Sequence, residues 1–385
     1  MLMKIISVVG ARPNFIKIAP FIHAINNHNK INNNKVEHLL VHTGQHYDDR
    51  MSKSFFEDLN IPEADINLNV GSGSHAEQVG QTMMAFEKVV KVEKPDWIVV
   101  VGDVNATLAC SVVAKKEWVK CCHIEAGLRS GDIRMPEEVN RLVTDKLSDL
   151  LLTPDLMSSE NLRKEGVSED RMVFVGNIMI DTLNKSIEKA SALKIENIIQ
   201  DNLIDDFKLK TNAPLDEKYA LITLHRPSNV DDKVVLKHLI SFIKDEVSKD
   251  LTIIWPIHPR TLKQLHTFGL YNEVVSCEKM ILLKPLGYFD MLRLNISSKI
   301  MLTDSGGLQE ECTVLGTPCL TLRWNTERPI TLKEYGGASV LVGNNIERIR
   351  KEYLIALSLK RQPEIPPLWD GKTADRCLQA ILNVN

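Results

Sequence analysis

The stretch Thr303-Asp304-Ser305-Gly306-Gly307-Leu308-Gln309-Glu310-Glu311 follows an apolar run at 300–302 and leads into a segment that ends at Gly316. This pattern predicts a buried strand, a Ser-Gly-Gly turn and a helix closed by a glycine. Such a turn presents backbone N–H groups at the positive end of the helix dipole, and its glycines leave room for a phosphate. The acidic pair Glu310-Glu311 would repel a phosphate, so we expect it to accept hydrogen bonds from sugar hydroxyls. Alone, the turn is equally compatible with an ordinary strand-to-helix connection.

In the first half of the chain, apolar runs alternate with helical segments, starting with a β-branched run at 4–9. Alternating strands and helices predict an open, doubly wound parallel sheet, in which ligands bind at the carboxyl ends of the strands. An Asn- and Lys-rich stretch at 26–34 is expected to be a solvated loop. Polar residues that follow predicted strands are Arg12, Gln45, Asp103 and Glu125. We therefore expect a ligand site at this edge of the sheet.

A second series of strands, each ending in a polar loop, begins at Tyr219 after a polar connection at 181–216. The fold class is therefore α/β, with two doubly wound, Rossmann-like domains that we expect to face a central cleft. We place the first domain at 1–176 and the second, nucleotide-binding domain at 177–365. A C-terminal helix within 366–385 is expected to pack back on the first domain.

Composition excludes several classes of function. The chain has 385 residues, of which 44% are apolar, enough for two cores, and its net charge is −3 from 47 basic and 50 acidic side chains. No basic patch dominates, so we expect neither a nucleic-acid nor a membrane surface. The seven cysteines have no paired spacing, and the chain enters its first strand without a leader. These features predict reduced thiols in a cytoplasmic protein.

The titratable residues near the predicted strand ends suggest acid–base chemistry. They are Asp103, Glu125, Glu137 and Glu138 in the first half and His225 and His258 in the second. Carboxylates in a closed cleft can act as acid and base, although each taken alone is as readily a solvated charge. No metal-ligand spacing, nucleophile elbow, Walker loop or three-glycine dinucleotide turn is present. A nucleotide-sugar enzyme without metal or NAD fits this pattern.

Five motifs are spread over nearly the whole chain. They are Gly10-Ala11-Arg12-Pro13, His123-Ile124-Glu125-Ala126-Gly127-Leu128-Arg129, Pro136-Glu137-Glu138-Val139-Asn140-Arg141, Thr303-Asp304-Ser305-Gly306-Gly307 and Thr326-Glu327-Arg328-Pro329. Together they resemble the non-hydrolysing UDP-N-acetylglucosamine 2-epimerases, which have the two-domain GT-B fold. The combination is specific, whereas no single motif is.

The resemblance implies a reversible epimerisation at carbon 2 of a UDP-N-acetylhexosamine, without an external cofactor, by a homodimer. UDP is eliminated with loss of the carbon-2 proton, 2-acetamidoglucal stays bound, and UDP adds back after a proton reaches the opposite face. Two faces require two proton-handling groups, which is why several carboxylates suit the site.

The resemblance also implies roles for particular residues. The catalytic positions fall on Asp103, Glu125, Glu137 and His225. The substrate-binding positions fall on Arg12 and Lys17 near the diphosphate, on Ser305, Gly306, Gly307 and Glu311 for UDP, and on His258 in a His-Pro loop. A second, activating nucleotide sugar in some bacterial members is bound near the positions of Gln45, His46 and Glu138.

Two departures from the family pattern affect these expectations. Pro227-Ser228 stands where the family usually has a glutamate in a His-Arg-x-Glu-Asn loop, and Ile330 stands where glutamate usually follows Glu-Arg-Pro. The first departure lies in a loop used by the activating ligand, so activation is in doubt. The alternatives are an epimerase of a modified UDP-sugar such as a 2,3-diacetamido uronic acid, a hydrolysing epimerase, a glycosyltransferase, and a catalytically silent nucleotide-sugar-binding protein.

Overall fold

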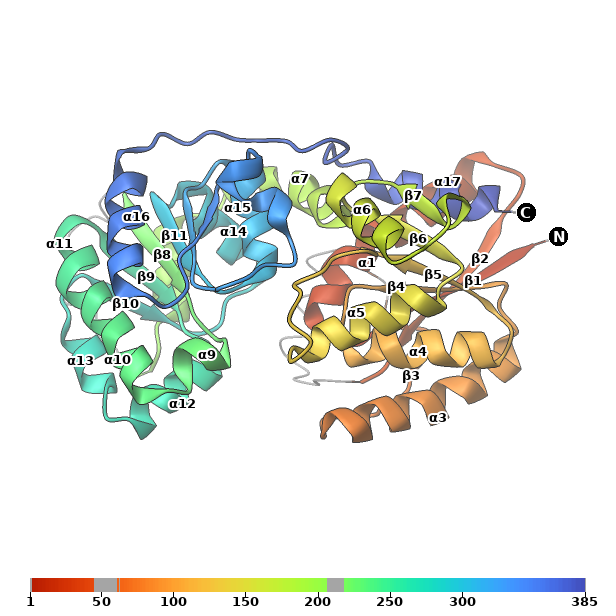
Figure 1. Cartoon of the computed structure of the whole chain (residues 1–385), viewed down its shortest axis with the longest axis horizontal. Helices are drawn as coiled ribbons and strands as arrows, with labels where there is room; N and C mark the ends of the chain where they lie inside the picture. Colours follow the sequence, from red (N-terminus) through yellow and green to blue (C-terminus); the bar gives the residue numbers. More distant parts are fainter. Residues whose placement is uncertain (1, 45–60, 62, 206–217, 385) are drawn as a thin grey trace. The chain divides into compact units, whose positions relative to one another are not determined.

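The chain forms two compact units. The computed structural model describes residues 2–44, 61, 63–205 and 218–384, apart from the side chains of Arg12 and Pro13. The first unit comprises Met1–Lys185 and Pro366–Asn385, and the second comprises Ser186–Ile365 (Figure 1). Helix α7 (Ile178–Ser191) spans the division between the units, whereas the boundary that we predicted precedes this helix.

The sheet of the first unit is parallel throughout, with the order β3-β2-β1-β4-β5-β6-β7 in the described residues. Its strands are β1 (Met3–Val9), β2 (Val36–His42), β3 (Ile66–Asn67), β4 (Trp97–Val101), β5 (Lys120–Ile124), β6 (Leu150–Thr153) and β7 (Met172–Phe174). The strand order reverses between β1 and β4. In open parallel sheets, such a switch point is where ligands bind at the carboxyl ends of the strands.

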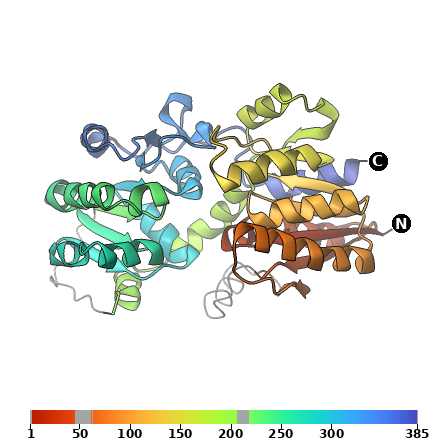
Figure 2. The same ribbon diagram turned by 60° about the horizontal axis from the view of Figure 1, so that its bottom comes forward.

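Helices cover both faces of this sheet. They are α1 (Arg12–Ile31), α3 (His75–Glu93), α4 (Asn105–Lys116), α5 (Pro136–Leu147), α6 (Leu156–Lys164), α7 and α17 (Thr373–Asn383), with a short 3₁₀ turn at Glu169–Arg171. Ile6 and Val8 pack in one cluster with residues of α3 and α4, which lie side by side (Figure 2). The alternate residues Ile5 and Val9 are buried as well, so the opposite face is also covered.

Helix α1 continues to Ile31, so the predicted loop at 26–34 is wrong over most of its length. Asn29 explains the difference. Its side chain donates a hydrogen bond to the carbonyl of Val36 and accepts one from the Val36 N–H, both at 2.8 Å. Because the helix propensity of Asn is only a few tenths of a kcal/mol below that of good helix formers, this tertiary contact decides the conformation.

The C-terminal residues return to the first unit, where α17 packs against α1. The buried carboxylate of Asp181 accepts hydrogen bonds from the N–H groups of Thr373 and Ala374, at 3.1 and 2.7 Å, and so caps α17. The returning chain crosses so close to Gly176 that a Cβ atom there would lie 2.1 Å from the Leu368 carbonyl. Glycine is therefore required at 176, where φ is also +93°.

The second unit has a parallel sheet with the order β10-β9-β8-β11-β12-β13 in the described residues. Its strands are β8 (Tyr219–Thr223), β9 (Thr252–Pro256), β10 (Met280–Leu283), β11 (Ile300–Thr303), β12 (Cys319–Thr321) and β13 (Ser339–Leu341). The strand order reverses between β8 and β11. The two parallel α/β sheets confirm the predicted fold class.

The helices of the second unit alternate with its strands. They are α8 (Ile195–Asn202), α9 (Pro227–Val230), α10 (Lys233–Phe242), α11 (Ser248–Asp250), α12 (Pro259–Thr267), α13 (Tyr271–Ser276), α14 (Tyr288–Ser297), α15 (Gly306–Leu315) and α16 (Ile346–Ser358), with a π-helical turn at Ile243–Val247 and 3₁₀ turns at Pro329–Thr331 and Lys333–Tyr335.

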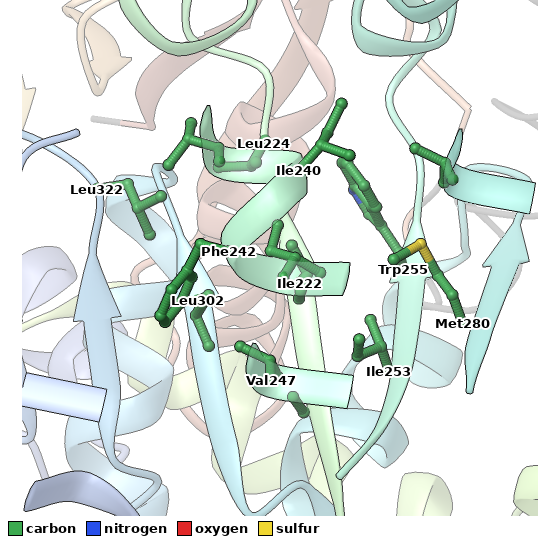
Figure 3. Close-up of a cluster of buried hydrophobic side chains, with 14 of the residues drawn as sticks. Ile222, Leu224, Ile240, Phe242, Val247, Ile253, Trp255, Met280, Leu302 and Leu322 are labelled. Atoms are coloured by element: carbon green, nitrogen blue, oxygen red, sulfur yellow. The ribbon is translucent and has the colours of Figure 1, made fainter. Parts of the chain in front are cut away.

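Both faces of the second sheet are buried in apolar clusters. Ile222 and Leu302 from neighbouring strands pack with Phe242 of α10 and Trp255 of β9 on one face (Figure 3). Leu221, which alternates with Ile222 along β8, belongs to the cluster on the other face. A strand that is buried on both faces has a continuous apolar sequence, which is why these strands were readily predicted. Across the described ranges, no helix combines the length and apolarity needed to cross a bilayer.

Candidate active site

In the first unit, Glu125 follows β5 directly and forms a buried ion pair with Lys17 of α1. The backbone of Glu125 is left-handed, with φ of +72°, which few residues other than glycine adopt. Gly102, at the end of β4, makes room for the pair, because a Cβ atom there would lie 3.2 Å from Lys17 Nζ. The loops after β4 and β5 therefore meet at this ion pair, next to the switch point.

The second carboxylate oxygen of Glu125, Oε1, is buried and has no hydrogen-bond partner in the described part of the chain. Lys17 contacts only the other oxygen, Oε2. A buried carboxylate oxygen without a partner costs on the order of 1–3 kcal/mol or more. An oxygen in this state has room to accept a hydrogen bond or a proton.

Asp103 follows β4 and is held by helix α5. Its Oδ2 lies 2.5 Å from Nη1 of Arg141, and its backbone carbonyl accepts a hydrogen bond of 2.8 Å from Asn140 Nδ2. The Asp103 side chain is 24% exposed, whereas the Arg141 side chain is 2% exposed. The buried arginine thus fixes one oxygen of Asp103, while the Asp103 carboxylate stays partly exposed.

Glu138 completes this arrangement from inside the protein. Its carboxylate lies 2.6 Å from Arg141 Nη2 and accepts hydrogen bonds from the N–H groups of Ser130 and Gly131, at 3.0 to 3.1 Å. Burial alone would raise the pKa of Glu138, but these N–H donors and Arg141 outweigh it and lower the pKa. Glu138 therefore holds Arg141 and the 130–131 turn in place.

The other site residues predicted in the first unit are Glu137, Arg12, Gln45 and His46. Glu137 is half-buried in the first turn of α5, where a carboxylate is favoured by the helix dipole. The side chain of Arg12 and the whole of Gln45 and His46 lie outside the described residues. The structure thus pairs Lys17 with Glu125 and places Asp103 at the end of the neighbouring strand β4.

In the second unit, Asp304 organises the loop after β8. It follows β11, is fully buried, and accepts hydrogen bonds from the N–H groups of His225 (3.0 and 3.1 Å) and Arg226 (2.8 Å) and from Asn229 Nδ2 (3.1 Å). It also lies 2.7 Å from Nδ1 of His225. Burial opposes ionisation, but His225 and the backbone donors outweigh it and lower the pKa of Asp304.

An ionised Asp304 can only accept hydrogen bonds. Nδ1 of His225 therefore carries a proton and donates a hydrogen bond to the carboxylate. The other ring nitrogen, Nε2, is then available to exchange a proton. His258 lies beside it, with ring centroids 5.6 Å apart, and its Nδ1 accepts a hydrogen bond of 3.1 Å from the Arg260 N–H. Burial and the neighbouring His225 lower the pKa of His258, so its neutral ring presents an Nε2–H donor.

The Ser-Gly-Gly turn begins helix α15, as predicted from the sequence. Ser305 donates its N–H to Thr303 Oγ1 at 3.0 Å, and the first N–H groups of the helix have no partners within the helix. A Cβ atom at Gly306 would lie 2.7 Å from Glu327 Oε1 and 2.8 Å from Arg328 Nη1. Gly306 therefore leaves room for the charged side chains that pack behind the turn.

Those charged side chains form a buried cluster. Arg328 pairs with Glu327 and with Glu310, the latter at 2.8 Å, and Arg323 pairs with Glu327 at 2.6 Å. All four side chains are less than 8% exposed, and their two positive and two negative charges balance. Such a balanced cluster fixes the loop at 323–328 against the N-terminus of α15.

Glu311, one turn into α15, is a buried side chain of the second unit. Its carboxylate interacts with the hydroxyl of Tyr288 and the side-chain amide of Asn295, which are buried as well. Burial, to which the charge of Glu310 adds, raises the pKa of Glu311 to about 7.

We predict that Glu311→Gln removes a pH dependence of stability. The folded-state pKa of about 7 lies above the ordinary value of 4.5, so proton binding favours the folded state at low pH. This contribution is lost as the pH rises from about 4.5 to about 7, and amounts to about 3 kcal/mol. The ligand-free variant should therefore gain in Tm relative to wild type between pH 5 and pH 8. Parallel Tm profiles of the two proteins would contradict the assignment, and the exposed Glu334→Gln serves as the control.

Three residues that support the site were not predicted as site residues. Asp304 was only part of a quoted motif, and its partners are 75 to 79 residues away in the sequence. Arg141 and Asp145 are buried on α5, at positions 3 and 7 residues after Glu138. A charged stripe at helical spacing within an α/β sheet was the available signal, because charged residues on a buried helix face need partners.

Comparison with known proteins agrees with these findings. Residues 29–382 match the family model of UDP-N-acetylglucosamine 2-epimerase. The chain is 40% identical over 380 residues to a UDP-N-acetylglucosamine 2-epimerase of Methanocaldococcus jannaschii, covering 98% of this chain and 99% of the relative. It is 38% identical to a UDP-2,3-diacetamido-2,3-dideoxy-D-glucuronate 2-epimerase of Pseudomonas aeruginosa, covering 89% and 88%.

A crystal structure of the M. jannaschii UDP-GlcNAc 2-epimerase in complex with UDP-GlcNAc and UDP superimposes with a TM-score of 0.87, at 39% identity and 99% coverage of both chains. In the described part of the present chain, no group of three or more His, Cys, Asp or Glu side chains is placed to hold a metal ion. The resemblance seen in the sequence motifs is confirmed by these comparisons, and the chain belongs to the UDP-N-acetylglucosamine 2-epimerase family.

Proposed function

We propose that the protein interconverts UDP-N-acetylglucosamine and UDP-N-acetylmannosamine without hydrolysis. In the forward direction, the C2–H bond breaks and its proton goes to a carboxylate. The electron pair forms a C1=C2 double bond, and the C1–O bond to UDP breaks, so that 2-acetamidoglucal and UDP remain bound. Protonation of the opposite face of C2 and re-addition of UDP to C1 complete the inversion, with no net redox change.

The observation that carries this proposal is the state of Glu125. One carboxylate oxygen is held by Lys17, while the other is buried and has no hydrogen-bond partner in the described residues. Lys17 holds this carboxylate in one orientation, and the carboxylate stays able to take a proton. Abstraction of a weakly acidic C–H proton requires a base that is both oriented and unprotonated. We therefore assign Glu125 as a catalytic base, and Lys17 as the residue that orients it.

Inversion requires a second proton-handling group that reaches the opposite face of the sugar. Asp103 and Glu137 come from the same edge of the first sheet as Glu125 and supply carboxylates for this step. His225 contributes a further proton-exchanging group, since Asp304 holds its Nδ1 and leaves Nε2 available. We assign all three residues to proton transfer in the elimination and the re-addition.

For UDP, we assign the N–H groups of Gly306 and Gly307, together with the Ser305 side chain, to a phosphate, because they lie at the positive end of α15. Arg12 and Lys17 are assigned to the diphosphate. His258, in the His-Pro loop, is assigned to substrate binding. Gln45, His46 and Glu138 are assigned to a second nucleotide-sugar site, in which the buried Glu138 would act by holding the 130–131 turn.

Glu311→Ala is expected to weaken UDP binding by about 1–3 kcal/mol, since a ribose hydroxyl loses its partner. Isothermal titration with UDP measures this loss directly. Glu347→Ala is the control, because Glu347 is an 85% exposed side chain on α16 of the same unit. Equal UDP affinity of Glu311→Ala and Glu347→Ala would contradict the assignment.

The proposed function is tested by incubating the protein with UDP-N-acetylglucosamine alone and identifying the products by NMR. An equilibrium mixture with UDP-N-acetylmannosamine is expected without added metal or NAD. Release of free N-acetylmannosamine and UDP would instead identify a hydrolysing enzyme. Turnover only of a UDP-2,3-diacetamido-glucuronate would identify a modified sugar as the substrate.

We also propose that the protein is a cytoplasmic homodimer. Its seven cysteines are all free thiols, as expected in a reducing compartment. Apolar side chains are exposed on α3, on α5 and in the loop before α5 of the first unit, with Met84 62% exposed, Ile133 63% and Val139 40%. Exposed apolar surface of this kind is typical of an interface. Light scattering coupled to size exclusion should give twice the chain mass of 43.5 kDa.

A further inference from the structure

His123, near the end of β5, is fully buried and makes hydrogen bonds through both ring nitrogens. Nε2 lies 2.8 Å from the backbone carbonyl oxygen of Gly102, and Nδ1 lies 2.6 Å from Oδ1 of Asp145 on α5. A carbonyl oxygen can only accept a hydrogen bond, so Nε2 carries a proton. The state of Nδ1 then depends on whether Asp145 is ionised.

Asp145 accepts two further hydrogen bonds from groups that can only donate. The Gly127 N–H lies 3.0 Å from Oδ2, and Nη1 of Arg129 lies 2.7 Å from the same oxygen. These two donors, one of them a cation, favour the ionised form of Asp145. An ionised carboxylate has no proton to donate, so Nδ1 of His123 also carries one. The ring is therefore a buried imidazolium.

The surrounding charges are balanced, which such a buried cation requires. Arg129 contacts Asp145 on one side, and on the other it donates two hydrogen bonds of 2.7 Å to the carboxylate of Glu165. His123, Asp145, Arg129 and Glu165 thus form a continuous chain of two cations and two anions. The chain ends at the Gly102 carbonyl on one side and near α6 on the other.

This chain of charges joins the two loops that carry the proton-handling residues. The Gly102 carbonyl immediately precedes Asp103, and the Gly127 N–H belongs to the loop that begins with Glu125. Resting on the function proposed above, we propose that His123 and Asp145 are positioning residues that fix Asp103 and Glu125 relative to each other as an imidazolium–carboxylate pair. Neither residue touches the substrate in this account.

The first test uses His123→Gln and Asp145→Asn, which keep similar shapes but cannot form the charged pair. A displacement of about 1 Å in a reacting group can cost about 10²-fold in rate, so each variant should lose kcat by roughly that factor. KM and UDP affinity should stay at wild-type values. The kcat of the double variant should fall no further than that of the less active single variant, because both changes break the same pair.

His38 provides a matched control within the same sheet. It lies on β2. Among the described residues, its ring makes one hydrogen bond, with the hydroxyl of Ser7 at 2.9 Å. Burial lowers the pKa of His38 to about 4, so its ring is neutral. His38→Gln should therefore retain the wild-type kcat.

The second test needs no variant. A neutron crystal structure of the wild-type protein at pH 7.5 should show deuterium on both ring nitrogens of His123 and on only one of His38. A single deuterium on His123 would overturn the proposal, and so would a wild-type kcat in both variants. The proposal would also be overturned if kcat fell only in proportion to the fraction of protein that still binds UDP, since that result indicates unfolding alone.

These tests also separate this proposal from the proposed function. If the wild-type protein makes no UDP-N-acetylmannosamine, the proposed function fails whatever the state of His123. The neutron structure and a crystal structure of His123→Gln, in which the 102–103 and 125–129 loops should move apart, report on the pair without any substrate.

Discussion

Replacing Glu125 by glutamine is expected to reduce kcat by about 10²- to 10⁴-fold, the usual contribution of a general base. The amide keeps the shape of the side chain, and its oxygen can still accept a hydrogen bond from Lys17, but it cannot take the carbon-2 proton. UDP should still bind, because Glu125 itself is not assigned to UDP and the amide keeps the hydrogen bond with Lys17, which is assigned to the diphosphate. Steady-state turnover of UDP-N-acetylglucosamine and calorimetric titration with UDP measure the two effects.

The control for this variant is Glu87→Gln, an exposed glutamate on α3 whose partner is the exposed Lys91. It should have wild-type turnover and wild-type UDP affinity. If Glu125→Gln lost UDP affinity as severely as Glu311→Ala, the division of roles between the two units would be wrong. Glu137→Gln is expected to behave like Glu125→Gln.

Replacing Asp304 by alanine is expected to destabilise the protein by about 3–5 kcal/mol and to abolish turnover. The variant leaves the N–H groups of His225 and Arg226 and the amide of Asn229 without their buried acceptor. Each buried donor that is left without an acceptor costs about 1–3 kcal/mol, so the loss of several gives an effect of this size. Urea unfolding followed by fluorescence of the buried Trp255 measures the loss in the second unit.

Asp231→Ala is the matched control for Asp304→Ala. Asp231 is an aspartate of the same unit whose side chain is 33% exposed, and its ion pair with Arg260 is exposed as well. Exposed ion pairs contribute about 0–1 kcal/mol, so this variant should be nearly as stable as wild type. Similar losses of stability in the two variants would show that Asp304 does not organise the β8 loop.

Most of the strands that were predicted from the sequence are continuous apolar runs. β4 and β8, for example, are continuous apolar runs because helices cover each side of their sheet. We predicted no strand at 339–341, where β13 forms an edge of the second sheet and has only three residues. Three residues are too few to show an alternating pattern, although the equally short β7 and β12 were predicted from the apolar runs that contain them.

The position of the candidate site was predictable, whereas its internal connections were not. Polar residues after predicted strands identified Asp103 and Glu125, because the carboxyl ends of parallel strands share one edge. The pairing of Lys17 with Glu125, and of His225 with Asp304, joins residues that are 108 and 79 positions apart. Such pairings depend on strand order, and the order β2-β1-β4-β5 cannot be read from local patterns.

The origin of the hydrogen at carbon 2 of the product tests the central claim most directly. The protein is incubated with UDP-N-acetylglucosamine in D2O, and the recovered UDP-sugars are examined by proton NMR and mass spectrometry. Proton abstraction by Glu125, elimination and re-protonation predict UDP-N-acetylmannosamine that carries deuterium at carbon 2, with UDP still attached. Inversion that retains the original hydrogen at carbon 2 would contradict the account.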